Sequence, residues 1–431
     1  VVYKGRSDGM NQWKSAHAAE TDRRTLAEAL DGADVFFGLS VKGALTADML
    51  RSMAPVWKSP MGVWVLTRYD DIAKLLKDQR FVHDFDGAIS DPRNRGALRE
   101  EPVYKQLGRS MLLRDPPDHT RLRGLVAKAF TARRVEEMRP QIEKVVNGLL
   151  DRLAPLGRMD VIEDFSHKLP VIVICDMLGI PEEDRAQFLT GYRVSGRAID
   201  PTPMTKAELD QVNANILGGR AYFKTLFERR RREPGDDLTS ALLQVQDEQE
   251  GRLSEDELYA NISLLFAAGH ETTTNLIGNG LLALHRNRDQ WDKLVANPDL
   301  ASGAVEELLR YDSSVQLTSR KASVDVEIGG QKIGRGEEVI CLLGAGNRDP
   351  EAYENPETLD ITRKNVRPLS FGGGIHTCLG AQLARLEGEI AFRALATRMP
   401  GMRIENMDNP QWKPTITLRR LEHLPAVWEV G

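Results

Sequence analysis

Cysteine is scarce in this chain. Only three cysteines, Cys175, Cys341 and Cys378, occur among 431 residues. Such an odd and sparse set cannot form a disulfide framework, so we expect reduced thiols. Cys175 and Cys341 lie in the apolar runs VIVICDMLGI and EEVICLLG, where a cysteine is interpreted as a small buried hydrophobe. Cys378 lies beside glycines instead and needs another explanation.

Long apolar runs and a bias toward one charge are also lacking. The longest apolar stretches, at 169–174 and 262–268, are shorter or more interrupted than the roughly 20 residues that span a bilayer. The first residues do not show the order of a secretory signal. Acidic and basic residues are interspersed, and the net charge is only −5 at pH 7, so nucleic acid is not an expected partner. We expect a cytoplasmic protein without a membrane partner.

The pattern of apolar residues predicts a mainly α chain with a small β portion. In the first 55 residues it indicates a helix at 21–30, a strand at 33–40 and a helix that opens after Thr46. Farther along, helical spacing predicts helices at 121–130, 135–153, 206–232 and 254 to about 285. Alternating segments around Gly329 and Gly330, and a segment near residue 65, indicate strands.

The predicted helix from residue 254 combines a strong start with an unusual middle. Ser254 and Glu257 have the spacing of a capping box. The middle, AAGHETTT, places a glycine, a histidine, a glutamate and three threonines in an apolar helix. Glycine costs about 1 kcal/mol against alanine in a helix interior, and a buried carboxylate costs more. Such a conflict indicates a functional site.

The segment FGGGIHTCLG, residues 371–380, carries the strongest chemical signal. Its three glycines allow backbone conformations that other residues avoid. Cys378 falls just before a predicted helix, where free N–H groups and the helix dipole favour a thiolate. A single thiolate does not suit tetrahedral zinc, but it suits an axial haem ligand. The alternative is a glycine-rich turn with an incidental buried cysteine.

This segment resembles the haem-binding loop of bacterial cytochromes P450, with matches at Phe371, Gly374, Cys378 and Gly380. The resemblance covers about residues 55–431. It implies the cytochrome P450 fold, with haem b between a long distal helix and a proximal cysteine loop. It also implies that Cys378 binds the iron and that Phe371, Gly372 and Gly380 contact the haem.

In the same family the long distal helix carries an acid and alcohol pair. AGHETT supplies Ala268 against the haem, Glu271 as a proton relay, and Thr272 to hold dioxygen and a water. Without the resemblance, Glu271 would be interpreted as a solvent-facing carboxylate. Thr272 would be interpreted as a hydroxyl bonded back to its own helix.

The haem propionates need donors, and the resemblance supplies four. They are His119, Arg123, Arg320 and His376. Each of them, taken alone, would be interpreted as a surface residue.

A pair in EELLR, Glu307 and Arg310, shares a helix face. Alone it would be a surface ion pair of little energetic value. The resemblance adds Arg363 from LDITR and predicts a buried three-member brace for the cysteine loop.

Residues 1–54 depart from the family. They resemble a fragment of the nucleotide-binding domain of bacterial malic enzymes, chiefly in LAEALDGADVFFGLSVKGALTADML. They contain no GxGxxG loop, and the catalytic residues of a malic enzyme would lie in absent parts. We interpret them as a non-catalytic, loosely docked fragment that was fused near Ala54. The alternatives are an artefact in the gene sequence and an unusual but genuine leader helix.

The resemblance implies a monooxygenase that uses dioxygen on a mainly apolar small molecule. Electrons are expected from a separate ferredoxin and ferredoxin reductase, docking near Cys378 where Arg123 and Lys128 help. A peroxide-driven peroxygenase, a non-catalytic haem protein and a malic-enzyme-like dehydrogenase are the alternatives. Residues 81–98, the segment before Arg320 and the long helix are expected to line the pocket. The substrate and the direction of His270 stay open.

Overall fold

The structure is a computed structural model that describes residues 47–59, 61–83, 98–191, 195–200, 202, 204–248 and 253–430. The predicted helix at 21–30 and the predicted strand at 33–40 lie outside the described residues. The described helices are α3 Ala47–Met53, α4 Tyr69–Leu75, α6 Pro102–Leu107, α7 Asp118–Val126, α8 Ala132–Glu137, α9 Arg139–Leu153, α10 Lys168–Met177, α11 Arg185–Gly191, α12 Lys206–Arg232, α13 Leu238–Glu248, α14 Glu255–Arg286, α15 Arg288–Ala296, α16 Ala301–Tyr311, α17 Leu343–Gly346 and α18 Ala381–Arg398.

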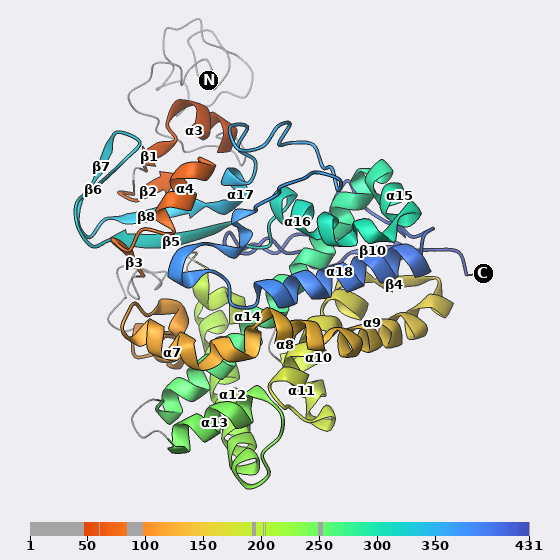
Figure 1. The fold of residues 1–431 in the computed structure, drawn as a ribbon, viewed down its shortest axis with the longest axis horizontal. Helices are drawn as coiled ribbons and strands as arrows, with labels where there is room; N and C mark the ends of the chain where they lie inside the picture. Colours follow the sequence, from red (N-terminus) through yellow and green to blue (C-terminus); the bar gives the residue numbers. More distant parts are fainter. Residues whose placement is uncertain are drawn as a thin grey trace, which may run out of the picture.

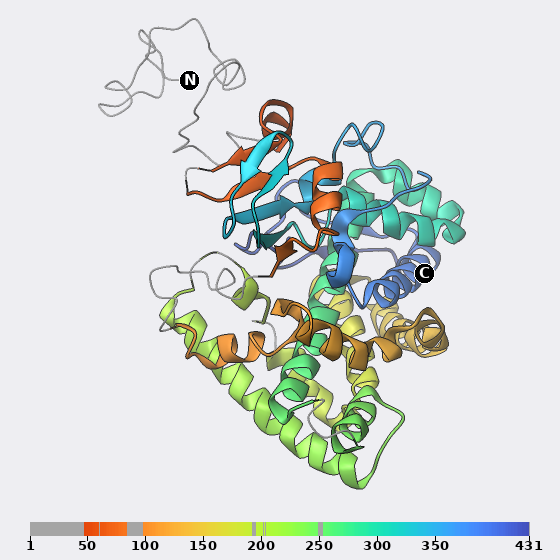
Figure 2. The same ribbon diagram turned by 60° about the vertical axis from the view of Figure 1, so that its left-hand side comes forward.

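The described strands are short. They are β1 Val56–Lys58, β2 Trp64–Leu66, β3 Phe81–Val82, β4 Arg158–Asp160, β5 Leu317–Ala322, β6 Val326–Ile328, β7 Gln331–Ile333, β8 Glu338–Leu342, β9 Arg403–Ile404 and β10 Pro425–Val427. The prediction of a mainly α chain with a small β portion is confirmed. Figures 1 and 2 show the sheet that contains β8 and β5 at one end of the molecule and α12 and α13 at the other.

The largest sheet has five strands in the order β1-β2-β8-β5-β3. β2 pairs with β8 in parallel, with Leu66 opposite Cys341, and the other pairs are antiparallel. Leu66 and Cys341 are both fully buried in a small apolar core that α4 covers. Cys175 is buried in the larger helical core. The interpretation of these two cysteines as buried hydrophobes is confirmed.

The long helix α14 runs through the middle of the helical body, with α18 and α10 packed against it (Figure 1). Its capping box is present, because Ser254 accepts from the Glu257 N–H while Glu257 reaches back to the Ser254 N–H. Gly280 is needed for packing, since a Cβ there would lie 2.6 Å from Phe392 of α18. Gly269 likewise lets Ile174 of α10 approach, at 3.2 Å from the position of a Cβ.

Two of the predicted helices differ from the structure at their boundaries. The segment 121–130 begins earlier, at Asp118, and ends in a 3₁₀ turn. The single helix predicted at 135–153 was wrong, because α8 ends at Glu137 and α9 begins at Arg139. Pro140 lies in the first turn of α9, where a backbone N–H has no partner within the helix and its absence costs nothing. In the interior of one continuous helix the same proline would remove a hydrogen bond and break the helix. The bounds predicted at 206–232 are confirmed.

The helix predicted after Thr46 is α3, and it packs on the sheet end of the molecule. Arg51 is 6% exposed, and its Nη2 donates to the carbonyl of Ala345 at 2.5 Å. The fusion boundary near Ala54 stays a prediction, but α3 contacts the main body directly.

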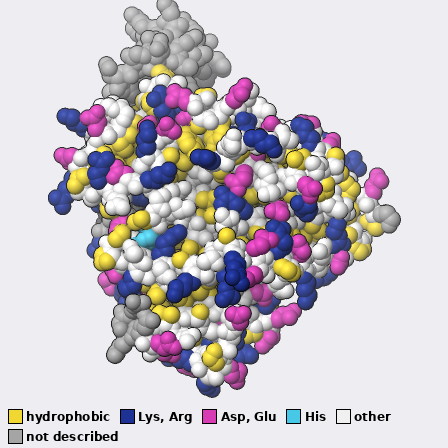
Figure 3. Space-filling view, viewed as in Figure 1, with side chains coloured by type: hydrophobic (Ala, Val, Ile, Leu, Met, Phe, Trp, Pro, Cys, Tyr) yellow, Lys and Arg dark blue, Asp and Glu magenta, His cyan; other side chains and the backbone are white. Residues whose placement is uncertain are grey.

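Within the described part of the chain, no helix has the length and apolar character needed to cross a membrane. On the face seen in Figure 3, basic and acidic side chains are mixed, as the interspersed sequence predicts.

Candidate active site

The cysteine loop contains two short 3₁₀ turns, Leu369–Phe371 and Gly374–His376, and it ends where α18 begins. The N–H of Cys378 donates to the carbonyl of Phe371 at 2.8 Å and closes the loop. Gly372 and Gly374 have φ of +68° and +67°, a region that favours glycine. A Cβ on Gly374 would lie 2.2 Å from the Leu76 carbonyl oxygen. Gly373 is extended, with φ of −164°, so only two of the three glycines use their freedom.

The side chain of Cys378 is accessible to solvent, but protein atoms lie densely around it. Burial raises its pKa, while the Gly380 N–H, Arg123 and Arg385 act in the opposite direction. The predicted helix-end effect is therefore present but smaller than the desolvation. A thiol in this setting becomes a thiolate when it coordinates a metal. No group of three His, Cys, Asp or Glu side chains in the described segments could hold an ion, so the donor set fits a single axial bond to haem iron.

A buried brace lies behind the loop. Arg310 and Glu307 have no exposed side-chain surface, and their Nη2 and Oε1 atoms lie 2.7 Å apart. Arg363 Nε lies 3.2 Å from the second oxygen of Glu307. Arg310 also donates to the carbonyl of Asn347 and to two further carbonyls of the segment 356–358. The predicted three-member network is confirmed.

Asn347 connects this brace to the cysteine loop. Its side-chain oxygen Oδ1 accepts from the Leu369 N–H at 2.7 Å, and its side-chain nitrogen Nδ2 donates to Ser313 and Ser370. Ser370 donates in turn to the Leu309 carbonyl. The brace thus supports the loop through a buried amide. This role of Asn347 was not predicted from the sequence.

Three of the four predicted propionate donors gather at one place. His119 of α7 is 2% exposed, Arg320 of β5 is 7% exposed, and the His119 and His376 rings lie 4.1 Å apart. The buried Nε2 atoms of His119 and His376 have no hydrogen-bond partner among the described residues. Desolvation lowers the pKa of His119 to about 4. Buried donors that the chain leaves unsatisfied fit the carboxylates of a haem.

Arg123, the fourth predicted donor, is fastened to the cysteine loop. Its Nη2 donates to the carbonyl of Thr377 at 2.6 Å, and its charge helps to lower the pKa of both His119 and His376. It therefore lies between the thiol and the imidazoles.

Between Leu258 and His285 of α14, Ala268 is the one exposed residue. It is the residue that the resemblance puts against the haem. Thr272 donates its hydroxyl hydrogen to the Ala268 carbonyl at 2.8 Å, so the interpretation as a hydroxyl bonded to its own helix holds in this structure. His270 points away into the core, where Nδ1 lies 2.8 Å from the Phe266 carbonyl oxygen and the ring contacts His167.

Glu271 is 9% exposed, so it is not a solvent-facing carboxylate. It forms a short ion pair with Arg420, whose side chain is also nearly buried. Arg420 comes from the segment after α18, far away in the sequence, and it was not predicted. The pairing holds the Glu271 carboxylate in one position, and no local sequence signal could have shown it.

Comparison with known proteins identifies the family. A family model described as cytochrome P450 matches residues 219–398. Cytochrome P450 107B1 of Saccharopolyspora erythraea is 43% identical over 370 residues, which cover 85% of this chain and 89% of that protein. The chain belongs to the cytochrome P450 family. It is a cytochrome P450 monooxygenase, and its cofactor is haem b.

Two further relatives of this cytochrome P450 are informative. The 6-deoxyerythronolide B hydroxylase of Saccharopolyspora erythraea is 39% identical over 393 residues, 88% of this chain and 94% of that protein. The crystal structure of P450BioI with an acyl carrier protein that bears hexadec-9Z-enoic acid has a TM-score of 0.81 and 40% identity, covering 89% of this chain and 97% of that chain. The predicted cytochrome P450 fold is confirmed.

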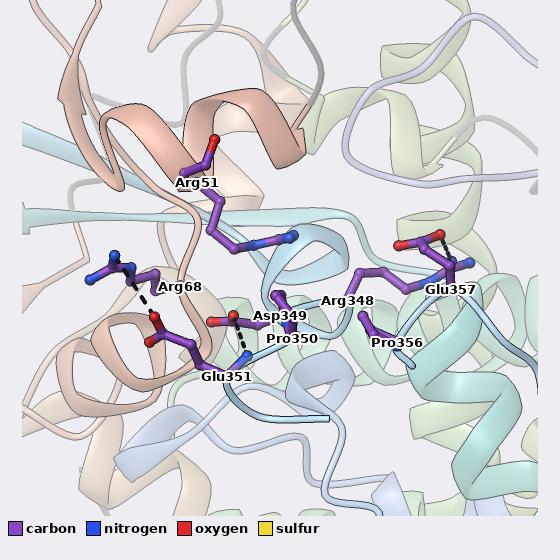
Figure 4. Close-up of a pocket in the computed structure, with 9 residues that line it drawn as sticks. Arg51, Arg68, Arg348, Asp349, Pro350, Glu351, Pro356 and Glu357 are labelled. Carbon is purple, nitrogen blue, oxygen red and sulfur yellow. Dashed lines mark hydrogen bonds and ion pairs between the residues drawn. The ribbon is translucent and has the colours of Figure 1, made fainter. Parts of the chain in front are cut away.

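A separate cleft of about 680 Å³ lies between α3 and the segment that follows α17. Figure 4 shows Arg51 reaching from α3 toward this segment, beside the pairs Arg68 with Glu351 and Arg348 with Glu357. None of the predicted haem contacts lines it. The cleft therefore belongs to the contact between α3 and the main body.

Proposed function

We propose that this cytochrome P450 inserts one oxygen atom into a C–H bond of a long, mainly apolar acyl or polyketide-derived molecule. The second oxygen atom leaves as water, and the balance requires two electrons and two protons for each dioxygen. We propose a cytoplasmic enzyme that takes the electrons from a separate ferredoxin and its reductase. The observation that carries the proposal is the acid and alcohol pair, Glu271 and Thr272, beside the open Ala268 face of α14.

The haem supplies dioxygen binding and activation, and a thiolate ligand favours cleavage of the O–O bond. Cys378 provides that ligand at the start of α18, while His119, Arg320 and His376 hold the propionates. Phe371, Gly372 and Gly380 belong to the cysteine loop that faces the cofactor. Each of these assignments is part of the proposal.

Proton delivery falls to α14. Glu271 is held by Arg420 within a nearly buried pair, so its carboxyl stays at a fixed place on the helix. A proton relay works only within hydrogen-bond reach, and a fixed carboxyl meets that condition. Thr272 must exchange its bond to the Ala268 carbonyl for one to dioxygen or water, a rotation of one side-chain torsion.

The substrate class rests on the relatives and on the pocket. One relative is named for 6-deoxyerythronolide B, and another is crystallised with a hexadecenoic acid on a carrier protein. Of the residues expected to line the pocket, 84–97 lie outside the described residues. Ala268 offers an apolar surface on α14.

The electron donor is proposed to dock on the cysteine-loop side. Lys128 is exposed at the end of α7, one helical turn beyond Arg123. Basic residues there would attract an acidic ferredoxin, with an association rate that falls as salt is added.

The test begins with the carbon monoxide difference spectrum of the reduced holoprotein. A red-shifted Soret band indicates the thiolate ligand, and its absence from a folded sample would contradict the proposal. Spectral titration with fatty acids, macrolides, terpenes and aromatics then selects a substrate. Turnover with heavy-isotope dioxygen and a ferredoxin system must place label in the product.

The alternatives give different results in the same assay. A peroxygenase forms product from hydrogen peroxide but not from dioxygen and a reductase. A non-catalytic haem protein shows no substrate-dependent consumption of dioxygen with either oxidant.

A further inference from the structure

A third imidazole lies in the propionate site. His83, which directly follows β3, is packed against His376 with ring centroids 4.1 Å apart and an interplanar angle of 74°. The ring centroid of His119 also lies 4.1 Å from that of His376, at an interplanar angle of 47°. We propose that His83 donates a hydrogen bond to a haem propionate, as a third member of a histidine clamp with His119 and His376. This inference rests on haem binding and is independent of the substrate.

The three rings share an unusual property. The Nε2 atoms of His83, His119 and His376 are all buried, and all lack a hydrogen-bond partner in the part of the chain that the structure describes. An unsatisfied buried polar group costs about 1–3 kcal/mol, and native structures contain few of them. Three of them in one cluster, from three separate segments, indicate a shared acceptor that the chain itself does not provide.

The backbone fixes His83 in this position. Its N–H donates to the Asp115 carboxylate at 3.2 Å, and β3 pairs with β5, the strand that carries Arg320. The Asp115 carboxylate also lies near His376, but its Oδ1 is 3.9 Å from Nε2 of that ring, too far for a hydrogen bond. Asp115 therefore positions the His83 backbone and leaves the imidazole donors for another group.

The charge of the site points to an anionic acceptor. Arg320 lies in the cluster as a buried cation, and together with burial it lowers the pKa of His83 to about 2. His83 is thus a neutral donor, and Arg320 supplies the positive charge. Metal binding is not the explanation, because these histidines do not form a metal-binding group within the described part of the chain. A carboxylate has two oxygens that accept several such bonds.

Haem retention is the direct measurement. The rate of haem transfer from the holoprotein to excess apomyoglobin would be compared for the parent, His83→Phe and His83→Gln. His119→Phe serves as the positive control, and His270→Phe, a buried histidine outside the cluster, as the negative control. We expect roughly tenfold faster transfer for His83→Phe, the size of one hydrogen bond to a charged group. His83→Gln, which retains an N–H donor, should recover most of this change.

A second cofactor separates a propionate contact from a packing role. The same proteins would be reconstituted with haem dimethyl ester, which has no carboxylate. The parent and His83→Phe should then lose the cofactor at the same rate. Equal rates with native haem, or a tenfold difference that persists with the ester, would overturn the proposal, as would a His83→Gln variant no better than His83→Phe.

The other source of a carboxylate is an acidic substrate. In that case His83→Phe would leave the rate of haem transfer unchanged and would weaken spectral titration by a fatty acid but not by the corresponding alcohol. The carbon monoxide spectrum is recorded for every variant. A retained thiolate band shows that the Cys378 bond, and with it the cytochrome P450 assignment, does not depend on this result.

Discussion

The two sides of the haem site differ in how completely the chain satisfies its own polar groups. Behind the cysteine loop, Arg310 and Arg363 both donate to Glu307 and to backbone carbonyls. At the propionate end, three imidazole nitrogens have no partner among the described residues. The support of Cys378 is therefore complete in the folded chain itself, whereas we infer that the propionate end is completed by the cofactor.

Replacing Cys378 should have the largest effect on the cysteine-loop side. Cys378→Ala removes the proposed thiolate, so we expect complete loss of the thiolate band in the carbon monoxide spectrum and of monooxygenase activity. The matched control is Cys175→Ala, which removes a buried thiol of the helical core. It should lower stability and leave the band in place. A thiolate band in Cys378→Ala would contradict the assignment.

Breaking the brace should be the next largest effect. Arg310→Ala removes the fully buried partner of Glu307 and leaves Arg363 as its remaining arginine partner, and we expect a loss of about 3 kcal/mol in the free energy of unfolding. Denaturant unfolding and the yield of haem-loaded protein measure this loss.

Arg393→Ala provides a control, because Arg393 pairs with Asp299 at the surface, with side chains 41% and 83% exposed. This variant should change stability by less than about 1 kcal/mol. Similar losses in the two variants would mean that burial of the brace is not what matters.

Glu387 is an exception on the cysteine-loop side. It is 1% exposed in α18, its Oε2 has no hydrogen-bond partner among the described residues, and burial raises its pKa well above the usual value. The folded chain therefore keeps a proton that the unfolded chain releases, and stability falls as the pH rises above about 4.5.

Glu387→Gln should remove this dependence. The slope it removes is about 1.4 kcal/mol per pH unit while the carboxyl stays protonated in the folded state. Urea unfolding of the parent and the variant at several pH values measures it. Glu389→Gln, which alters a neighbouring pair with Arg139, is the control. Parallel stability curves for the parent and Glu387→Gln would show that Glu387 is ionised in the fold.

On the distal side, the pair between Glu271 and Arg420 offers a smaller but sharper test. Arg420→Ala leaves Glu271 without the group that fixes it, so proton delivery should become less reliable. We expect roughly tenfold less product for each electron pair, and more hydrogen peroxide. A tenfold effect is smaller than the full contribution of a positioned proton donor, because Glu271 itself is retained.

The neighbouring residue supplies the control for this test. Arg419 pairs with Asp312 and stacks on Trp412, and Arg419→Ala should leave the coupling close to that of the parent. If Arg420→Ala forms as much product per electron pair as the parent, Arg420 has no role in proton delivery.

Features that depend on neighbours in the chain could be predicted from the sequence. The bounds of α12, the capping box of α14 and the buried state of Cys175 and Cys341 follow from local patterns, as do the positive φ angles around Cys378. The helix break before Pro140 could have been predicted from the same rules, but it was not. The contact between residues 47–53 and the main body was predicted only in part. The helix α3 was expected from the sequence, but its hydrogen bond through Arg51 was not.

What the sequence determined by itself is a helical chain with one cysteine in a glycine-rich loop before a helix, and acid and alcohol groups in a long apolar helix. Only the tertiary structure decided which distant side chains meet them. Arg420 and Glu271 are 149 residues apart, and His83 meets His376 across most of the chain. Burial, partner and direction are properties of the packed interior, and so no local pattern could show that Glu271 is held, that His270 turns away, or that three imidazoles share one acceptor.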